Sequence, residues 1–170
     1  MTNTKMLRGN VTIWAAYPEA FANLEAPTAA ELNNTALVKN ISCAIEDSYT
    51  LNTTSSDTDD SLSICDIGNV STPTFINYEA SLDGFRDEDI AANGVYNLFF
   101  NLFKVPGIPY VLIKRIGKPN TAPAAIGDTV SLYAVTTDNP AELLDDASMI
   151  RLGARFKTVG GVNANWKLVA

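Results

Sequence analysis

The sequence predicts a mainly β fold, an antiparallel sandwich or barrel that carries one α-helix on its side and a long extended loop. Several short stretches are rich in β-branched and aromatic residues and end at turn residues, only one long stretch has a helical period, and one stretch of ten residues has no apolar side chain. No repeat or proline-rich linker divides the 170 residues. We therefore expect a single domain that spans residues 1–170.

The first part of the chain predicts two strands with a short helix between them. Residues 11–17 (VTIWAAY) are β-branched and aromatic, and Pro18 follows them as a stop. Thr28 and Glu31 have the spacing of a capping box, in which two side chains satisfy free amides at the start of a helix. Residues 37–45 indicate the second strand.

The later strands are predicted by alternation of apolar and polar side chains. Residues 74–82 place four apolar side chains on one face, which makes this the clearest half-buried strand. These side chains are Ile76, Tyr78, Ala80 and Leu82. Further strands are predicted at residues 110–116, 129–137 and 149–159, with a turn at Gly160 and Gly161 and a closing strand at residues 166–169.

The one substantial helix is predicted at residues 90–103. Ile90, Leu98, Phe99 and Leu102 recur near helical spacing. Three acids precede them, at residues 87–89, where negative charge favours the positive end of a helix. Val105, Pro106 and Gly107 end the helix.

Residues 52–61 have nothing to bury, because all ten side chains are polar and uncharged or acidic. Such a segment cannot bury apolar area to offset the entropy that it would lose on ordering, so we expect it to be exposed to solvent. We extend the excursion to residue 73 and expect it to be unfolded until a partner covers it.

The charges are divided unevenly along the chain. The net charge is −7, and the segment from Glu46 to Asp89 carries eleven acids against one base, Arg86. The bases concentrate in the C-terminal half, where three of them alternate with apolar residues in a predicted strand. An acidic half and a basic half are expected where one subunit docks on the next, although a dipolar monomer is an equally good interpretation of the charges alone. The residues of this interpretation are the acids Asp57, Asp59, Asp60 and Asp66 and the candidate basic partners Arg151, Arg155 and Lys157.

The composition argues against most enzyme and cofactor chemistry. The chain has no histidine and only two cysteines, which excludes the usual histidine-assisted nucleophiles and the common zinc sites. No phosphate-binding glycine motif occurs, and the acids after Asp57 lack the glycine and the final glutamate of a calcium loop. Glu79 and Asp83 could form a carboxylate pair for glycoside hydrolysis, but a solvated strand edge is the simpler interpretation. We expect no cofactor, no metal and no catalytic residues.

The chain is expected to be made in the cytoplasm and to have no membrane partner. Its first residues contain no apolar run of signal-peptide length, and no stretch of about eighteen apolar residues occurs. The negative net charge also argues against sequence-specific DNA binding, which needs a basic face.

Five stretches of the sequence resemble a known protein family. They are residues 48–66 (SYTLNTTSSDTDDSLSICD), 72–79 (TPTFINYE), 85–87 (FRD), 110–118 (YVLIKRIGK) and 127–133 (GDTVSLY). Together they fall within roughly residues 40–140 and are similar to the major tail (tail tube) proteins of long-tailed bacteriophages, particularly those that infect actinobacteria. No single one of these stretches is diagnostic.

The resemblance implies a structural virion protein and no enzyme. It implies a β-sandwich flanked by a helix that closes into hexameric rings, and these stack into the tail tube, the conduit for genome delivery. The loop at residues 52–73 would then reach a neighbouring ring, and an acidic lumen would let double-stranded DNA slide without binding, with Glu79 and Asp83 as candidate lumen-facing residues. Tape-measure, tail terminator and distal tail proteins are the implied partners, and no C-terminal immunoglobulin-like domain is expected.

Two other classes remain open from the residues alone. The first is a soluble acidic β-sandwich that binds carbohydrate or calcium, and the second is a carboxylate-based hydrolase. A type VI secretion tube subunit is a close structural alternative to the phage protein, since it forms similar rings.

Overall fold

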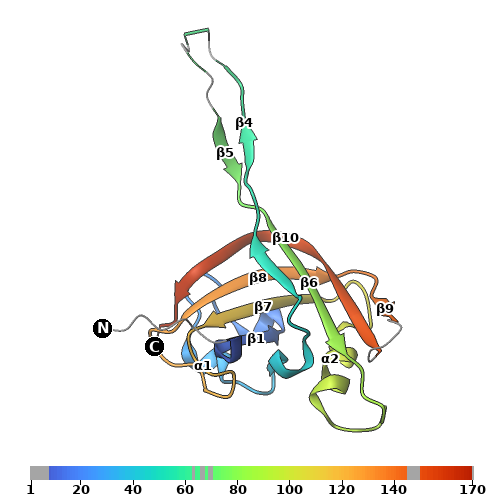
Figure 1. Cartoon of the computed structure of the whole chain (residues 1–170). Helices are drawn as coiled ribbons and strands as arrows, with labels where there is room; N and C mark the ends of the chain where they lie inside the picture. Colours follow the sequence, from blue (N-terminus) through green and yellow to red (C-terminus); the bar gives the residue numbers. More distant parts are fainter. Residues whose placement is uncertain (1–7, 63, 66–67, 69–70, 145–149, 170) are drawn as a thin grey trace, which may run out of the picture.

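Eight strands of the chain form one antiparallel sheet with a strong bend (Figure 1). The computed structural model describes residues 8–62, 64, 65, 68, 71–144 and 150–169, and for residues 161–165 it describes the backbone only. Along the sheet the order is β2-β1-β7-β8-β10-β6-β3, and β9 pairs with β10. The strands are β1 (Val11–Ala16), β2 (Val38–Asn40), β3 (Thr50–Thr53), β6 (Tyr78–Phe85), β7 (Pro109–Ile116), β8 (Thr129–Thr137), β9 (Ala141–Leu143) and β10 (Arg151–Lys167).

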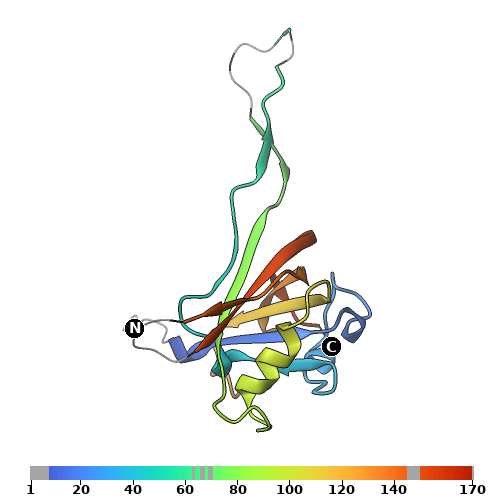
Figure 2. The same cartoon turned by 90° about the vertical axis from the view of Figure 1, so that its right-hand side faces the viewer.

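Each face of the sheet carries its own apolar core. The larger core fills the concave side and takes side chains from β1, β3, β6, β7, β8 and β10, closed off by helix α2 (Val95–Phe103). The smaller core lies on the other face of β1, β7 and β8, where Trp14, Val111 and Ile113 pack under helix α1 (Ala29–Leu32) and the 3-10 helix η2 (Pro18–Ala20). The rest of this second face, on β6 and the first half of β10, has no helix over it (Figure 2).

The capping box predicted at Thr28 and Glu31 is confirmed. The Glu31 amide donates to Thr28 Oγ1 at 3.1 Å, and the Thr28 amide donates to Glu31 Oε2 at 2.8 Å. Burial raises the pKa of Glu31, but the hydrogen bonds from the Ala22 amide and from Thr28 lower it by more. The helix that begins here is only one turn long.

The main helix begins later than the sequence predicts. α2 starts after Gly94, and Ile90, which was expected on its buried face, is 80% exposed. The acids expected at the helix start belong instead to the preceding turn, where Asp87 accepts from the Asp89 amide and Asp89 from the Ala91 amide. Local side-chain acceptors thus compete with the helix for these amides.

Two strand predictions need correction. The expected strand at residues 37–45 is limited to β2, because Ser42 accepts from the Ile13 amide and a 3-10 turn, η3 (Ser42–Ala44), follows. The expected strand at residues 74–82 is divided into β5 (Thr72–Phe75) and β6, so Ile76 is exposed whereas Tyr78, Ala80 and Leu82 are buried as predicted.

The expected turn at Gly160 and Gly161 is also wrong, since β10 runs through both glycines. The register against β8 shifts between Thr158 and Val162, and Gly160 has a φ of 82°. A glycine in this conformation absorbs a β-bulge and lets one strand continue where the sequence suggests two.

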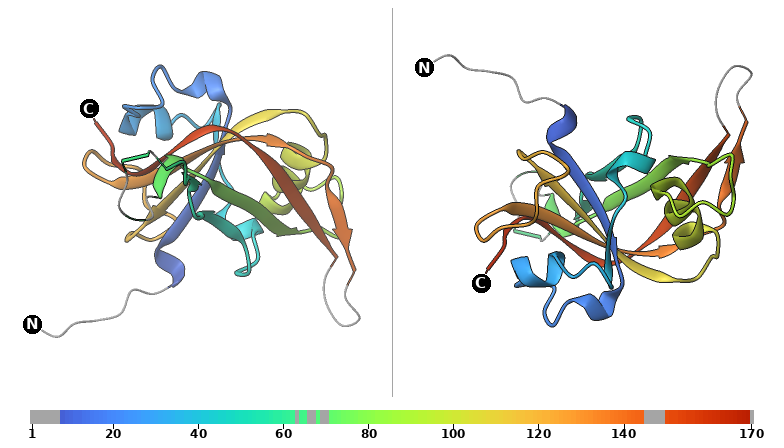
Figure 3. Two further views of the ribbon diagram at one scale, coloured as in Figure 1. Left: turned by 90° about the horizontal axis from the view of Figure 1, so that it is seen from above. Right: turned by 90° about the horizontal axis from the view of Figure 1, so that it is seen from below.

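A narrow ribbon rises from the body between β3 and β6 (Figures 1 and 2). It comprises residues 54–77, of which 63, 66, 67, 69 and 70 lie outside the described part, and we call it the arm. β4 (Asp57–Asp59) and β5 pair in it as a separate two-stranded sheet. Seen from above and from below, the arm stands on the β10 side of the body, and α1 and α2 lie on the opposite side (Figure 3).

Candidate assembly surfaces

The arm is almost entirely exposed to solvent. All seven residues of β4 and β5 are exposed, and β4 pairs with β5 through Asp57 and Phe75, Thr58 and Pro73, and Asp59 and Thr72. Near its base, Asn77 Nδ2 donates to Asp57 Oδ1 at 2.9 Å and the Thr54 amide donates to the Asn77 carbonyl at 2.9 Å. An isolated two-stranded hairpin is marginal in water, so the arm lacks the burial that would stabilise it in a free subunit.

Three of the four predicted loop acids lie on β4 or directly after it. Asp57, Asp59 and Asp60 are exposed, and Asp66 lies outside the described residues. Hydrogen bonds from the Ser61 side chain and amide lower the pKa of Asp59. Within the described part of the chain, no ion pair joins these three acids to a base of the same subunit.

The arm also exposes four large apolar side chains, of which one, Ile76, was expected to be buried. The exposed fractions are 58% for Leu62, 105% for Ile64, 70% for Phe75 and 61% for Ile76. Alternation suggested that Ile76 is buried, and that signal fails because the strand leaves the sheet at Asn77. Exposed apolar groups of this size on a projecting ribbon indicate a surface that another protein covers.

The base of the arm is fixed by two side chains that reach across the concave core. The Tyr78 hydroxyl accepts from the Val159 amide at 3.1 Å and donates to the Ala134 carbonyl, next to the bulge in β10. Lys114 on β7 donates to the Leu51 carbonyl and, at 2.7 Å, to Asn52 Oδ1, both on β3. Burial lowers the pKa of Lys114 and raises that of Tyr78.

The three candidate basic partners already pair with acids of the same chain. Arg151 pairs with Glu46, Arg155 with Asp83 at 2.7 Å, and Lys157 with Asp138 at 3.0 Å. The β10 bases therefore mainly neutralise neighbouring strands and loops of their own subunit, and they offer less free charge to a second subunit than the sequence suggests.

The two candidate lumen-facing acids share one face of β6. Glu79 is exposed and Asp83 half-buried, and both point away from the concave core because Tyr78, Ala80 and Leu82 point into it. Asp83 is bound by Arg155, whereas Glu79 lies opposite Asn52 in the register with β3. This uncovered face of β6 and β10 is a polar wall.

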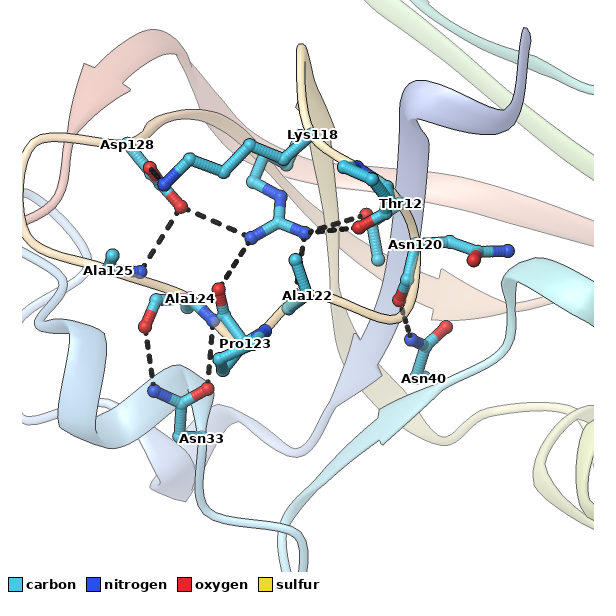
Figure 4. A network of polar contacts seen from close by, with 12 residues as sticks. Thr12, Asn33, Asn40, Lys118, Asn120, Ala122, Pro123, Ala124, Ala125 and Asp128 are labelled. Atoms are coloured by element: carbon cyan, nitrogen blue, oxygen red, sulfur yellow. Dashed lines mark hydrogen bonds and ion pairs between the residues drawn. The ribbon is translucent and has the colours of Figure 1, made fainter.

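A buried arginine organises the loop between β7 and β8. Arg115 is 1% exposed, and its guanidinium donates to the carboxylate of Asp128 at 3.1 Å and to Thr12 Oγ1 at 3.1 Å. It also donates to the carbonyls of Pro119, Ala122 and Pro123 (Figure 4). The burial of Arg115 could have been predicted from its position in the strand, since Arg115 shares a face of β7 with the buried Val111 and Ile113.

Asp128 is the charged partner of this network. Burial raises its pKa, but hydrogen bonds from Lys118, the Ala125 amide and Arg115 lower it by more, so the pKa lies below its ordinary value. The network ties the β7–β8 loop to β1 and β7.

One edge of β10 has no partner among the described strands. β10 pairs with β6 only over its first residues, from Arg151 to Arg155, and from Phe156 to Lys167 it pairs only with β8. An unpaired strand edge is a template for another strand and is normally covered in a native assembly.

The described residues offer little that resembles a ligand or metal site. A cavity of about 270 Å³ is lined by Val11, Ile13, Ile45, Glu46 and Tyr49. Two further hollows of about 440 and 390 Å³ have no charged side chain in their lining. No group of three or more acids or cysteines is placed to hold a metal ion in the part of the chain that the structure describes. None of the described helices is long and apolar enough to cross a membrane.

A mainly β body with an exposed arm and an unpaired strand edge indicates a subunit of an assembly. The family model described as phage tail tube protein matches residues 1–170, and the chain therefore belongs to the phage tail tube protein family. No curated protein matched the sequence.

Membership of this family shows where the protein is located and which class of protein it is. It is a structural, non-enzymatic component of the virion tail that assembles with itself and with other tail proteins. The predictions of a mainly antiparallel β fold and of a structural protein are confirmed.

Proposed function

We propose that six copies of this chain close into a ring, and that the rings stack into the hollow tail tube of a long-tailed phage. The arm carries the proposal, because it exposes apolar and acidic side chains that the subunit itself does not cover. In this role residues 1–170 act as one tail-tube domain, and the arm at residues 54–77 links successive rings.

The opposite placement of the arm and the helices favours stacking in one direction. The arm projects from the β10 side, and α1 and α2 lie on the other side (Figure 3). A projection on one side that binds a different surface on the other side makes a head-to-tail contact, and such contacts continue without closing. A tube of many rings needs this kind of interface along its axis.

Pairing around the ring would use the open edge of β10. The segment from Phe156 to Lys167 has donors and acceptors along one side that no described strand pairs with. A strand from the neighbouring subunit would satisfy them and would remove the aggregation risk of an open edge.

The polar wall on β6 and β10 is the candidate surface for the lumen. Glu79 is exposed there, and Asp83 carries its charge beside Arg155. A wall of net negative or balanced charge does not bind phosphates, so double-stranded DNA passes through it without specific contact. We expect Glu79 to contribute more than Asp83 to the repulsion of DNA phosphates, because no base of the described chain pairs with Glu79.

The remaining partners follow from the tube. A tape-measure protein would fill the lumen before DNA enters, a terminator would end the tube, and distal tail proteins would start it. We also propose, from the resemblance carried by residues 48–66 and 110–118, that the tube is that of an actinobacteriophage.

Negative-stain electron microscopy of the concentrated chain tests the proposal, with rings or hollow filaments as the expected result. Deletion of residues 55–61 should leave a folded protein that forms no long tubes, because the arm then loses its reach. The matched control replaces Asp57, Asp59 and Asp60 by Asn in an arm of full length. It separates the effect of arm length from the effect of the acidic charges. Tubes of normal length from the deletion variant would contradict the role of the arm, and no rings or filaments, even with the tail initiator complex, would contradict the tube.

A further inference from the structure

The chain contains a cationic aromatic surface whose charges have no carboxylate partner in the described part of the subunit. It consists of Phe85, Arg86, Tyr96, Phe100 and Lys104, and we call it the α2 stripe. Tyr96, Phe100 and Lys104 are four residues apart on α2 and its C-cap, so they form one line on the helix. Phe85 and Arg86 at the end of β6 lie beside this line, with the Phe85 and Tyr96 ring centroids 6.2 Å apart.

The two cations of the α2 stripe lack the acid partner that most other described bases of the C-terminal half have, although Lys114 and Lys167 have no described acid partner either. Arg86 lies over the Phe100 ring at 3.5 Å, and its Nε is buried without a hydrogen-bond partner. Lys104 lies 5.5 Å from the same ring and donates only to Asn101 Oδ1. In contrast, Arg115, Arg151, Arg155 and Lys157 all have acids of their own chain.

We propose that the α2 stripe is the receptor for the arm of a second copy of this chain, with the arm acids bound by Arg86 and Lys104. The proposal rests on the stacking role proposed above and names its binding site. The arm supplies the carboxylates that the α2 stripe lacks, since Asp57, Asp59 and Asp60 have no basic partner in the described chain. The apolar side chains also match, because Leu62 and Ile64 are exposed on the arm and Tyr96 is 38% exposed on the α2 stripe.

The positions of the two surfaces fit a head-to-tail contact. α2 lies on the side of the body away from the arm in both side views (Figures 1 and 2). The nine residues from 54 to 62 span at most about 30 Å when extended. This is about twice the radius of gyration of about 15 Å expected for a domain of this length, so the arm can reach over a neighbour.

The acids next to the α2 stripe are directed into their own turn. Asp87 accepts from the Asp89 amide and Asp89 from the Ala91 amide, at 3.1 and 2.9 Å. Glu88 and Asp89 are the exposed acids of this turn, and of the two only Glu88 accepts no described hydrogen bond. Replacement of Glu88 by Gln is therefore expected to strengthen the binding of an acidic arm.

Carbodiimide cross-linking tests the contact directly, since this reagent joins a lysine amine to a carboxylate that touches it. Equal amounts of ¹⁴N- and ¹⁵N-labelled full-length chain are mixed at high concentration, cross-linked and digested, and mixed-isotope peptides identify links between copies. We expect links from Lys104 to Asp57, Asp59 or Asp60. Arm acids linked to Lys118, Lys157 or Lys167 but not to Lys104, or linked to no lysine, would overturn the proposal.

Charge reversal provides the second test. Arg86→Glu together with Lys104→Glu should raise the protein concentration needed for half-maximal assembly by about tenfold or more, because like charges then oppose across the contact. Asp59→Lys with Asp60→Lys in the same chain should restore assembly. Lys157→Glu is the control, with an expected change below about twofold. Should Arg86→Glu lower the melting temperature, Lys104→Glu alone, at an exposed position, replaces the double variant.

The results separate this inference from the tube itself. Tubes of normal length and stability from the charge-reversed chain would overturn the receptor assignment and leave the tube proposal intact. A wild-type chain that forms no tubes but gives links between Lys104 and the arm would support the receptor and contradict the tube.

Discussion

Arg155 on β10 donates a hydrogen bond of 2.7 Å to Asp83 on β6, and its guanidinium passes over Gly153 to do so. A Cβ atom at position 153 would lie 2.9–3.1 Å from the guanidinium, so a glycine leaves the room that the side chain uses. The contact places a base and an acid side by side on the polar wall. Two acids of the acidic segment, Glu46 and Asp83, are thus neutralised within the subunit.

The Arg155–Asp83 pair is expected to contribute little to stability. The Arg155 side chain is 39% exposed, and solvent screens pairs of this kind to about 1 kcal/mol or less. A double-mutant cycle with Arg155→Gln and Asp83→Asn, followed by urea unfolding, measures the coupling. The same cycle on Lys157 and Asp138 is the control and should show no measurable coupling. A coupling above about 2 kcal/mol would contradict the screened-pair description.

Gly84→Ala is expected to destabilise the subunit by about 1–3 kcal/mol, because it overpacks the concave core. A Cβ atom at this position would lie 2.3 Å from the ring of Phe99, which is fully buried. Gly9→Ala is the matched control, since no heavy atom lies within 4 Å of its Cβ position. Chemical denaturation of both variants measures the difference. Equal stability of the two would show that α2 moves to accept the methyl group.

Tyr78→Phe should cost about 1 kcal/mol, because it removes the hydrogen bonds that the hydroxyl accepts from the half-exposed Val159 amide and donates to the Ala134 carbonyl. The hydroxyl bridges the β10 bulge at the base of the arm, so amide exchange at Val159 should become faster. Tyr96→Phe is the control, because its hydroxyl has no described hydrogen bond. Unchanged protection at Val159 in the Tyr78 variant would argue against the bridge.

The sequence predicted the sheet well where both faces of a strand are buried. β8 has the predicted limits, and β1 and β7 differ from theirs by one residue. Periodicity failed where a strand leaves the sheet, as at Ile76, and where a bulge continues a strand, as at Gly160. Both events depend on partners that are distant in sequence.

The candidate site could be predicted only in part. The absence of apolar residues at 52–61 was sufficient to predict the excursion, because it is a local property. The partners of the charged side chains are distant in the sequence. Counting acids and bases therefore could not show that Arg155 pairs with Asp83 or that Arg86 lies over the Phe100 ring. The assignment of bases to contacts between subunits therefore needed the fold.

Asp128→Asn should lower the free energy of unfolding at pH 7 by about 3–5 kcal/mol, because it leaves the guanidinium of Arg115 buried without its charge partner. The pKa of Asp128 is lowered in the folded state, so its contribution is complete above the ordinary value of 3.8 and is lost as the pH falls through the folded pKa. Wild-type stability should thus decrease below about pH 4, and part of this decrease should be missing in the variant. Asp138→Asn, at an exposed carboxyl, is the control.

Lys114→Met tests whether the base of the arm is held from the opposite side of the sheet. Burial lowers the pKa of Lys114 below 10.5, which shows that the fold disfavours its charge, while the donors to Leu51 and Asn52 offset that cost. The net change in stability at pH 7 should therefore stay within about 1.5 kcal/mol. Amide exchange in β3 should nevertheless become faster, because its carbonyl and side-chain contacts to β7 are lost.

The pH dependence of the Lys114 variant separates this description from simple loss of packing. Between the folded pKa and 10.5 the unfolded chain binds more protons at this group than the folded chain does, so wild-type stability gains a contribution as the pH rises through that window. Lys114→Met lacks this contribution, and its stability relative to wild type should fall as the pH approaches 10.5. Lys39→Met, at an edge strand, is the control. Parallel pH profiles for Lys114→Met and the wild type would mean that Lys114 is solvated in the folded subunit, and β3 would then depend on β6 alone to orient the arm.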